Sequence, residues 1–304
     1  MRVVSLLPSA TEMVCIVGAG QDLVGISHEC DFPEFIRDLP ALTRARIAPF
    51  ASSKAIDTAV REVIRDALSI YAVDEPKLAA LAPDVIVTQD LCEVCAVSLD
   101  DVRSAVARLS HRDAVSIVSL SPTRLEHVWG DIETVARALG KAAHGAEIRA
   151  ELEARVRAIA LRAARVPSRP RVVSIEWLDP IMLGGTWMPE LIELAGGTAV
   201  GAHAGEPAPT VTPAELASLA PDVVLVKPCG FAIDRTMKER DIVERTIAGS
   251  VGKKARVYVS DGNAFFNRPG PRLVESLEIM AACVHPALFA DFAETHADVI
   301  RSIG

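Results

Sequence analysis

The sequence predicts an α/β protein made of two similar Rossmann-like lobes with parallel sheets, joined by a long backbone helix, with a ligand cleft between the lobes. Three observations support this fold class. Apolar strand-like runs alternate with helical segments, and a ten-residue helix–strand unit occurs twice. An Ala/Glu/Arg-rich stretch near the middle has the composition of a long helix. Strands that are apolar at every position are typical of parallel sheets covered by helices on both faces.

The repeated unit covers residues 78–87 (LAALAPDVIV) and recurs 138 positions later at residues 216–225 (LASLAPDVVL). This spacing excludes a solenoid, whose repeats recur every ~20–50 residues. We interpret each copy as a helix, a turn and a buried strand. The copies diverge where their strands end, into QDLCEVC in the first and KPCGF in the second.

The elements of the first lobe follow from apolar periodicity and from helix start signals. Strands are expected at residues 2–7, 23–26, 85–88 and 115–120. Helices are expected at residues 9–17, 54–68, 75–81 and 99–109. Ser9 and Glu12 have the spacing of a capping box, which predicts that Ser9 begins the first helix. The proline-containing segment up to residue 52 is expected to be a loop.

The middle of the chain is expected to form one linking helix, weakened only near Gly140 and Gly145. A continuous helix of ~40 residues would be ~60 Å long, which suits a strut across two lobes better than a connection inside one. The predicted domains are therefore residues 1–121 (first lobe), 122–167 (linking helix) and 168–304 (second lobe with closing helices).

The second lobe repeats the alternation. Strands are expected at residues 172–175, 223–226 and 256–259. Helices are expected at residues 189–194, 213–219, 234–248, 272–284 and 286–300. Thr212 is the expected cap of the second of these helices, with Pro213 at the first helical position.

Charge and hydropathy argue against nucleic-acid binding, membrane insertion and secretion. The net charge of −8, without a basic run, argues against a nucleic-acid partner. No apolar run approaches the ~20 residues that span a bilayer, so we expect no membrane insertion. Pro8 and Glu12 interrupt the apolar run that a secretory signal would need. We therefore expect a cytoplasmic protein whose six cysteines are thiols.

Residues able to contact a ligand concentrate after the expected strands. In open α/β sheets, ligands bind outside the carboxyl ends of the strands. The candidate ligand-binding residues are Ser27, His28, Glu29, Asp31, Gln89, Glu176, Trp177, Asp179, Trp187, Lys227, Phe231, Asn263, Phe265, Phe266, Asn267 and Arg268.

The aromatic candidates stand out because the chain has only 3 Trp, 2 Tyr and 8 Phe. We interpret Trp177, Trp187, Phe265 and Phe266 as a wall facing a flat, largely apolar ligand, and not as core residues. The polar residues Asn263, Asn267, Arg268 and Arg272 would either contact the ligand or tie their own loop.

The charged candidates allow more than one interpretation. We read Lys227 as a charge contact or a solvated side chain in preference to a nucleophile. Glu176 and Asp179 could be an acid–base pair or metal ligands, and equally turn or cap residues.

The cysteines suggest a metal site. Thiolate and imidazole are good ligands for zinc and iron. His28, Cys30, Cys92 and Cys95 would supply four ligands in the first lobe, with Cys229 approaching from the second. A CxxC pair is also a redox motif, and free cysteines are often small buried hydrophobes. We assign the latter role to the remaining pair, Cys15 and Cys283.

The chain resembles the helical-backbone (class III) substrate-binding proteins of ABC transporters, and among them the cobalamin-binding proteins. The segments that carry the resemblance are VVSLLPSATEMV, SHECDFP, APDVIV, EWLDPIMLGGTWMPELIELAGG and DGNAFFNRPGPRLVESLEIMA. The resemblance implies that a corrinoid such as cobalamin, or a related metal chelate, lies in the cleft and contacts the strand-end loops. It also implies an ABC permease as a partner. Typical members are exported, and typical cobalamin binders lack the His-x-Cys and CxxC set, so we expect a cytoplasmic subgroup.

Three functions stay open from the sequence. The first is a binding protein for a corrinoid or related chelate. The second is a metal-ion or metal-cluster binder that uses the cysteines and His28. The third is a cytoplasmic enzyme in which a thiol-bound metal activates water or substrate. We favour binding, and no residue is assigned a catalytic role, because the chain has no P-loop, GxGxxG motif or serine-hydrolase elbow at a strand–helix junction.

Overall fold

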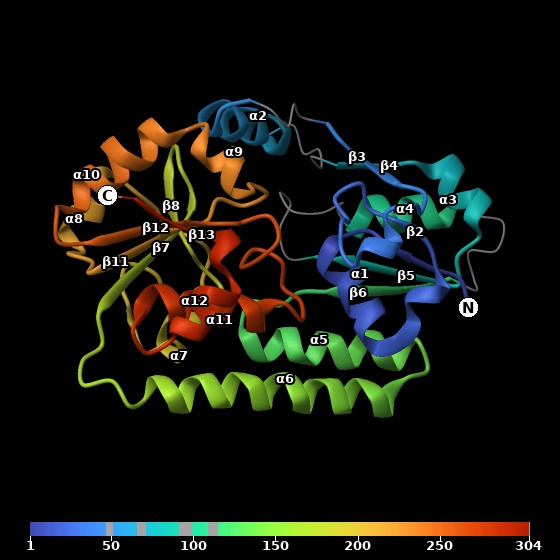
Figure 1. Cartoon of the computed structure of the whole chain (residues 1–304). Helices are drawn as coiled ribbons and strands as arrows, with labels where there is room; N and C mark the ends of the chain where they lie inside the picture. Colours follow the sequence, from blue (N-terminus) through green and yellow to red (C-terminus); the bar gives the residue numbers. More distant parts are fainter. Residues whose placement is uncertain (47–50, 66–70, 91–98, 109–114, 304) are drawn as a thin grey trace. The chain divides into compact units, whose positions relative to one another are not determined.

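The computed structural model describes residues 1–46, 51–65, 71–90, 99–108 and 115–303. The chain divides into two compact units (Figure 1). Unit 1 contains Met1–Ala51, Ala55–Pro122 and Glu126–Glu151, and unit 2 contains Ser52–Lys54, Thr123–Leu125 and Leu152–Gly304. Both units are α/β, so the predicted fold class is confirmed.

The main sheet of unit 1 has four parallel strands in the order β2-β1-β5-β6. These are β1 (Val3–Ser5), β2 (Leu23–Ile26), β5 (Val85–Gln89) and β6 (Ser116–Leu120). The central strands β1 and β5 are buried at every residue, as expected for a parallel sheet covered on both faces. Leu78 of α3 (Glu75–Leu81) and Val102 of α4 (Leu99–Ala107) pack in one core with Ile86 of β5.

The first helix begins differently from the prediction. In α1 (Pro8–Val14) the N-cap is Leu7, no side chain caps the helix, and Ser9 is buried in the first turn. Proline has a helical φ and no N–H to leave unpaired, so Pro8 can start the helix without a capping serine. The predicted capping box at Ser9 is therefore wrong. The chain then reaches β2 through η1 (Cys15–Ala19) and η2 (Gly20–Asp22).

Unit 1 also contains a small antiparallel sheet that the sequence did not predict. β3 (Thr43–Ala45) pairs with β4 (Tyr71–Val73). β3 lies in the segment expected to be loop, which also holds η3 (Glu34–Ile36). Strands of three residues are too short for an alternating pattern to mark them. The expected helix after this segment is present as α2 (Ser53–Arg65).

The linking stretch is two helices, α5 (Leu125–Ala138) and α6 (Ala142–Ala163), and not one strut. The break falls at Gly140, whose φ of +70° suits glycine. α6 then turns back along α5 (Figure 1), and a Cβ on Gly145 would lie 2.3 Å from the Cβ of Ala136. The 22-residue α6 begins in unit 1 and ends in unit 2. In the described part of the chain, no helix is long and apolar enough to cross a membrane.

The sheet of unit 2 has seven strands in the order β10-β8-β7-β11-β12-β13, with β9 also paired to β7. They are β7 (Arg171–Trp177), β8 (Ile181–Leu183), β9 (Thr198–Ala199), β10 (Thr210–Val211), β11 (Val223–Val226), β12 (Arg256–Ser260) and β13 (Ile300–Ile303). The three predicted strands, β7, β11 and β12, run parallel in the middle. The antiparallel strands β8, β10 and β13 were not predicted.

The helices of unit 2 match the prediction except near the C-terminus and around residues 234–248, where three short helical segments replace the single helix expected. They are α7 (Met188–Leu194), α8 (Pro213–Ser218), α9 (Ile233–Met237), η5 (Ile242–Ala248), α10 (Gly249–Val251), α11 (Leu273–Val284), α12 (Ala290–Thr295) and η6 (Ala297–Val299). Thr212 and Glu215 form a capping box on α8, as the sequence predicted for Thr212. The helix expected at residues 286–300 is wrong, because only α12 and η6 lie there and the chain then pairs with the edge of β12 as β13.

The two repeat copies fold alike, as predicted. Each forms a short helix followed by a central strand, α3–β5 in unit 1 and α8–β11 in unit 2. Ala82 and Ala220 end these helices in the left-handed region, with φ of 41° and 43°. The Pro that follows each alanine cannot continue the helix, so the chain turns directly into the strand.

An arginine and an aspartate complete each copy. In unit 1, the N–H of Arg2 donates to Oδ2 of Asp84 at 2.7 Å, and its Nε donates to the carbonyl of Leu81 at 2.7 Å. In unit 2, the N–H of Arg171 donates to Oδ2 of Asp222 at 2.8 Å, and its guanidinium likewise bonds carbonyls at the end of α8. The repeat is therefore a packing unit that fixes the central strand of each sheet.

Candidate functional site

The carboxyl ends of the parallel strands carry a cluster of polar and aromatic side chains in each unit. In unit 1 the cluster follows β2 and is organised by Thr43 of β3. Oγ1 of Thr43 lies 2.9 Å from Oγ of Ser27 and 2.7 Å from Nδ1 of His28, and it accepts the N–H of His28 at 3.0 Å. Thr43 is a site residue that the sequence prediction missed, because nothing along the chain marks it.

His28 pairs with Tyr71 of β4, which the prediction also missed. Their rings meet edge-on with centroids 5.2 Å apart, and the Tyr71 hydroxyl donates to Oε1 of Glu29 at 3.1 Å. Burial lowers the pKa of His28, although the Glu29 carboxylate opposes the shift. The imidazole is therefore neutral near pH 7, the state in which histidine can ligate a metal.

The other candidates of unit 1 are more enclosed. Sγ of Cys30 lies 3.1 Å from Oγ1 of Thr11 on α1, and the residue is buried. The carbonyl of Asp31 accepts Nε of Arg37 at 3.0 Å. Gln89 is buried at the end of β5. Cys30 therefore contacts α1, whereas its neighbour His28 contacts β3 and β4.

The structure gives no support to the predicted thiol–imidazole metal site. Among the described residues, no group of three or more His, Cys, Asp or Glu side chains is placed to hold a metal ion. Cys92 and Cys95 lie outside the described residues. Cys229 is a half-buried free thiol in unit 2. Burial above all raises the pKa of Cys15 and Cys283 to about 12, which makes both thiols unreactive.

In unit 2, Lys227 connects three strand ends. It follows β11 and is completely buried, and its Nζ lies 3.3 Å from Oε2 of Glu176 at the end of β7. The same Nζ donates to Oδ1 of Asn267, in the loop after β12, at 2.8 Å. Burial lowers the pKa of the Lys227 ammonium, although Glu176 opposes the shift. Lys227 therefore faces the protein and makes a charge contact, the first of the two roles predicted for it, and it is not the solvated side chain that was the other.

Trp177 is held by Phe231, which the prediction included, and by Ser53, which it did not. Its ring packs on Phe231 with centroids 5.2 Å apart, and its Nε1 donates to the carbonyl of Ser53 at 3.2 Å. The guanidinium of Arg235 lies over the Phe231 ring, 4.0 Å from its centroid, and is ion-paired to Glu239 at 2.9 Å. Glu239 in turn accepts the N–H of Ser53 at 3.0 Å. Only the i,i+4 spacing of Arg235 and Glu239 is visible in the sequence.

Two predicted wall residues belong to the core of unit 2. Trp187 is 5% exposed and Phe266 is fully buried. Nε1 of Trp187 donates to the carbonyl of Phe266 at 2.8 Å, and the N–H of Phe266 donates to Oγ of Ser276 at 2.9 Å. Their polar groups and rings are used inside the unit, which corrects the expectation that they face a ligand.

The remaining candidates lie in the turn after β7 and in the loop after β12. Asp179 is half-buried in the turn. In the loop, Nη2 of the buried Arg268 donates to Oδ1 of Asn263 at 3.2 Å. Phe265 is half-buried, with the guanidinium of Arg272 5.5 Å from its ring centroid. The polar side chains of this loop therefore tie the loop itself, one of the two roles expected of them.

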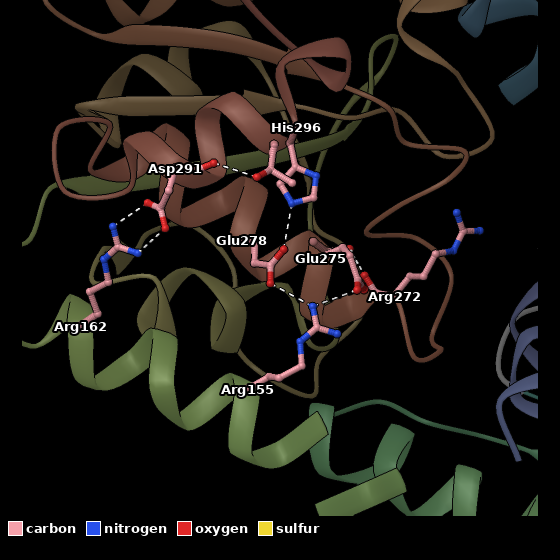
Figure 2. A network of polar contacts seen from close by, with 9 residues as sticks. Arg155, Arg162, Arg272, Glu275, Glu278, Asp291 and His296 are labelled. Atoms are coloured by element: carbon pink, nitrogen blue, oxygen red, sulfur yellow. Dashed lines mark hydrogen bonds and ion pairs between the residues drawn. The ribbon is translucent and has the colours of Figure 1, made fainter. Parts of the chain in front are cut away.

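Figure 2 shows the polar network beneath this loop. Arg155 of α6 donates to Glu275 at 3.0 Å and to Glu278 at 2.9 Å, both on α11. Oε2 of Glu278 lies 2.9 Å from Nε2 of His296, whose ring contacts Phe265. Burial acts to raise the pKa of Glu278, but hydrogen bonds from His296 and Arg155 outweigh it and hold that pKa below its usual range. The network fixes α11 as the base of the loop.

Residues 3–263 match the family of periplasmic binding proteins. The chain belongs to this family. No curated protein matches it. The similarity to solved structures extends over nearly its whole length, and it confirms the helical-backbone fold that the sequence resemblance implied.

Two solved structures illustrate this periplasmic-binding-protein fold. A periplasmic haem-binding protein from Pseudomonas aeruginosa is 19% identical with a TM-score of 0.70, over 94% of this chain and 93% of that chain. The periplasmic vitamin B12 binding protein BtuF of Vibrio cholerae is 16% identical with a TM-score of 0.65, over 96% of this chain and 98% of that chain. At these identities the similarity shows the fold alone.

A cavity of ≈ 680 Å³ in unit 2 of the binding protein lies away from the strand-end loops. Residues of α6, α7 and the segment after β9 line most of it. Two ion pairs, Arg124–Glu190 and Arg169–Glu193, lie in its wall. Glu190 also accepts the N–H of Leu125 at 2.9 Å. Since these charges neutralise one another and no described candidate residue lines the cavity, we do not place the ligand there.

Proposed function

We propose that this member of the periplasmic binding protein family binds a planar metal chelate, with a corrinoid such as cobalamin as the first candidate, through the strand-end loops of its units. The family membership supports small-molecule binding. Proteins that share the fold bind haem or vitamin B12, so both macrocycles are reasonable ligands to test.

The observation that carries the proposal is a partly exposed ring at the strand ends of each unit. In unit 2, Trp177 is half-buried and supported from behind by Phe231. In unit 1, the His28 ring is supported by Tyr71. Rigid rings of this kind offer flat apolar area at little cost in side-chain entropy, which suits a large planar ligand.

Titration of the protein with cyanocobalamin and, separately, with haemin tests the proposal. We expect a visible spectral change and quenching of tryptophan fluorescence with at least one of them. Trp177→Ala is expected to weaken binding about tenfold or more, the usual effect of removing an aromatic anchor. Trp129→Phe, in the core of unit 1, is the matched control and should leave the affinity unchanged. If neither chelate binds at 100-fold molar excess, the proposal fails.

Metal analysis of the same preparation tests the alternative that the protein binds a metal ion through its thiols. A retained zinc or iron that is lost in a Cys92→Ser/Cys95→Ser variant would favour that alternative. No group of described residues supports it, so we expect neither metal at stoichiometric amount.

Two wider features of the function stay predictions. An ABC permease is the expected partner, on the strength of the family, and co-purification with a permease would test it. The cytoplasmic location expected from the sequence can be tested by cell fractionation.

A further inference from the structure

In unit 2, the carboxylate of Glu176 lies at the carboxyl end of β7. It is held in place by the buried Lys227, which Asn267 also contacts. The side chain of Lys227 has no exposed surface, whereas that of Glu176 is 24% exposed. The ion pair uses Oε2 of Glu176 at 3.3 Å. Among the described residues, Oε1 of Glu176 has no hydrogen-bond partner. The pair therefore presents an acceptor outward and keeps its cation inward.

The cluster of Glu176, Lys227 and Asn267 is rigid, because the side-chain amide of Asn267 both accepts and donates hydrogen bonds within it. Its Oδ1 accepts Nζ of Lys227, while its Nδ2 donates to the carbonyls of Lys227 at 3.0 Å and Gly262 at 2.9 Å. A Cβ on Gly262 would lie 2.1 Å from the carbonyl oxygen of Pro228, so the loops after β11 and β12 touch through backbone. Lys227 cannot turn outward without breaking these contacts.

Two arginines of the neighbouring loops, Arg235 and Arg268, are already engaged by other groups. Arg235 is ion-paired to Glu239 and covers Phe231. Arg268 is buried and bonded to Asn263. Nearby Asp261 adds no donor, since its Oδ1 accepts backbone N–H groups of its own loop. The Glu176 carboxylate, next to Trp177 in the chain, is thus an acceptor that cannot donate.

We propose that Glu176 is a specificity-determining residue, set in place by Lys227 as a positioning residue, and that it selects chelates with neutral amide side chains over chelates with carboxylates. The inference rests on the proposed function. An ionised carboxylate only accepts hydrogen bonds, so an amide N–H satisfies it and a second carboxylate is repelled. The side chains of a corrinoid are largely amides, and those of haem include two propionates, so the cluster favours the corrinoid.

A matched pair of ligands tests this selectivity on one macrocycle. Cobinamide carries amides where cobyrinic acid carries carboxylates. We expect the wild-type protein to bind cobinamide about tenfold more tightly at pH 7.5, the effect of one hydrogen bond to a charged group. The ratio of the two affinities is the readout, because general damage to the loops would weaken both ligands alike.

Two variants test whether the charge of Glu176 causes the selectivity, independently of any damage to the fold. Glu176→Gln combined with Lys227→Met removes both charges, so no unpaired buried ion remains. It should bring the affinity ratio close to one. Glu176→Gln alone keeps the buried ammonium and should move the ratio further, toward the carboxylate ligand. Glu206→Gln, which removes an exposed carboxylate elsewhere in unit 2, should keep the wild-type ratio.

Each outcome has a separate meaning. A wild-type preference for the carboxylate ligand, equal binding of both, or a ratio that the double variant leaves unchanged would overturn the selectivity role of Glu176 while leaving the proposed function standing. Failure of both corrinoids and of haemin to bind would remove the proposed function itself.

Discussion

At the scale of residues, Lys227 in unit 2 and Asp131 in unit 1 are both buried ionisable groups, but they differ in their hydrogen bonding. The side chain of Lys227 has no exposed surface, but its Nζ is ion-paired to Glu176 and donates a hydrogen bond to Asn267. Asp131 on α5 is the contrasting case, because its buried Oδ2 has no hydrogen-bond partner among the described residues. Burial raises the pKa of Asp131 to about 7. A carboxyl group that is uncharged when folded and charged when unfolded makes stability depend on pH.

The sign of this dependence follows from proton counting. Between its unfolded pKa of about 3.9 and its folded pKa, Asp131 binds more protons in the folded state than in the unfolded state. The free energy of unfolding therefore falls as the pH rises through this window from about pH 4 to pH 7, and no further loss from this group occurs above it.

We predict that Asp131→Asn removes this loss. Relative to the wild type, its free energy of unfolding should increase between pH 4 and pH 7 and exceed the wild-type value by about 1–2 kcal/mol at pH 8, a figure reduced because the group is partly solvated. Urea denaturation at pH 4.5, 6 and 8 measures the difference. A difference that stays flat across these three values would show that Asp131 is charged in the folded protein.

At the scale of elements, two glycines on the linking helices have opposite surroundings. A Cβ on Gly145 of α6 would lie 2.3 Å from the Cβ of Ala136 on α5. A Cβ on Gly130 of α5 would have no atom within 4 Å. The close approach is held by Arg149 and Glu133, whose charged atoms are 3.1 Å apart. Gly145 thus permits α6 to return along α5.

Gly145→Ala should lower the free energy of unfolding by about 1–3 kcal/mol, because the added methyl group separates α5 from α6. Gly130→Ala is the matched control, and it should raise stability by up to about 1 kcal/mol through helix propensity alone. Thermal denaturation of both variants gives the comparison. Similar stability changes in the two variants would contradict the packing role of Gly145.

At the scale of the molecule, each unit has its own strand-end cluster. The cluster of unit 1 includes His28 and Tyr71, and that of unit 2 includes Trp177 and Glu176. A ligand that contacts both units should order the loops of both. One that contacts a single unit should leave the other unchanged.

We predict that saturating chelate slows amide hydrogen exchange in segments 27–31 and 227–231 together, the first in unit 1 and the second in unit 2. A ligand at 100 times its Kd should also raise the free energy of unfolding by about 2.7 kcal/mol. Exchange followed by mass spectrometry locates the protection, and α12 serves as an internal control that should not respond. Protection confined to unit 2 would rule out ligand contact by unit 1.

Local chemistry predicted much of the scaffold. The repeat at residues 78–87 and 216–225, the apolar parallel strands and the Thr212 cap all depend on neighbours in sequence, and the structure confirms them. The predicted start of the first helix was wrong because Pro8 and Ser9 are both helix-start signals and the helix begins at Pro8. The strands β3 and β13 were missed because they are too short to show an alternating pattern. The sequence marks Gly140 as a weak point of the linking helix, but the reversal there depends on the packing of α6 against α5.

By itself, the sequence determined the fold class and the strand ends at which to look for a site. Only the tertiary structure decided what each side chain does there. It buried Trp187 and Phe266 in the core, turned Lys227 inward, and brought Thr43 to Ser27 and Ser53 to Glu239. The physical reason is that strand order and helix periodicity depend on residues close in sequence. The role of a polar or aromatic side chain depends on partners that only folding brings within a few ångströms.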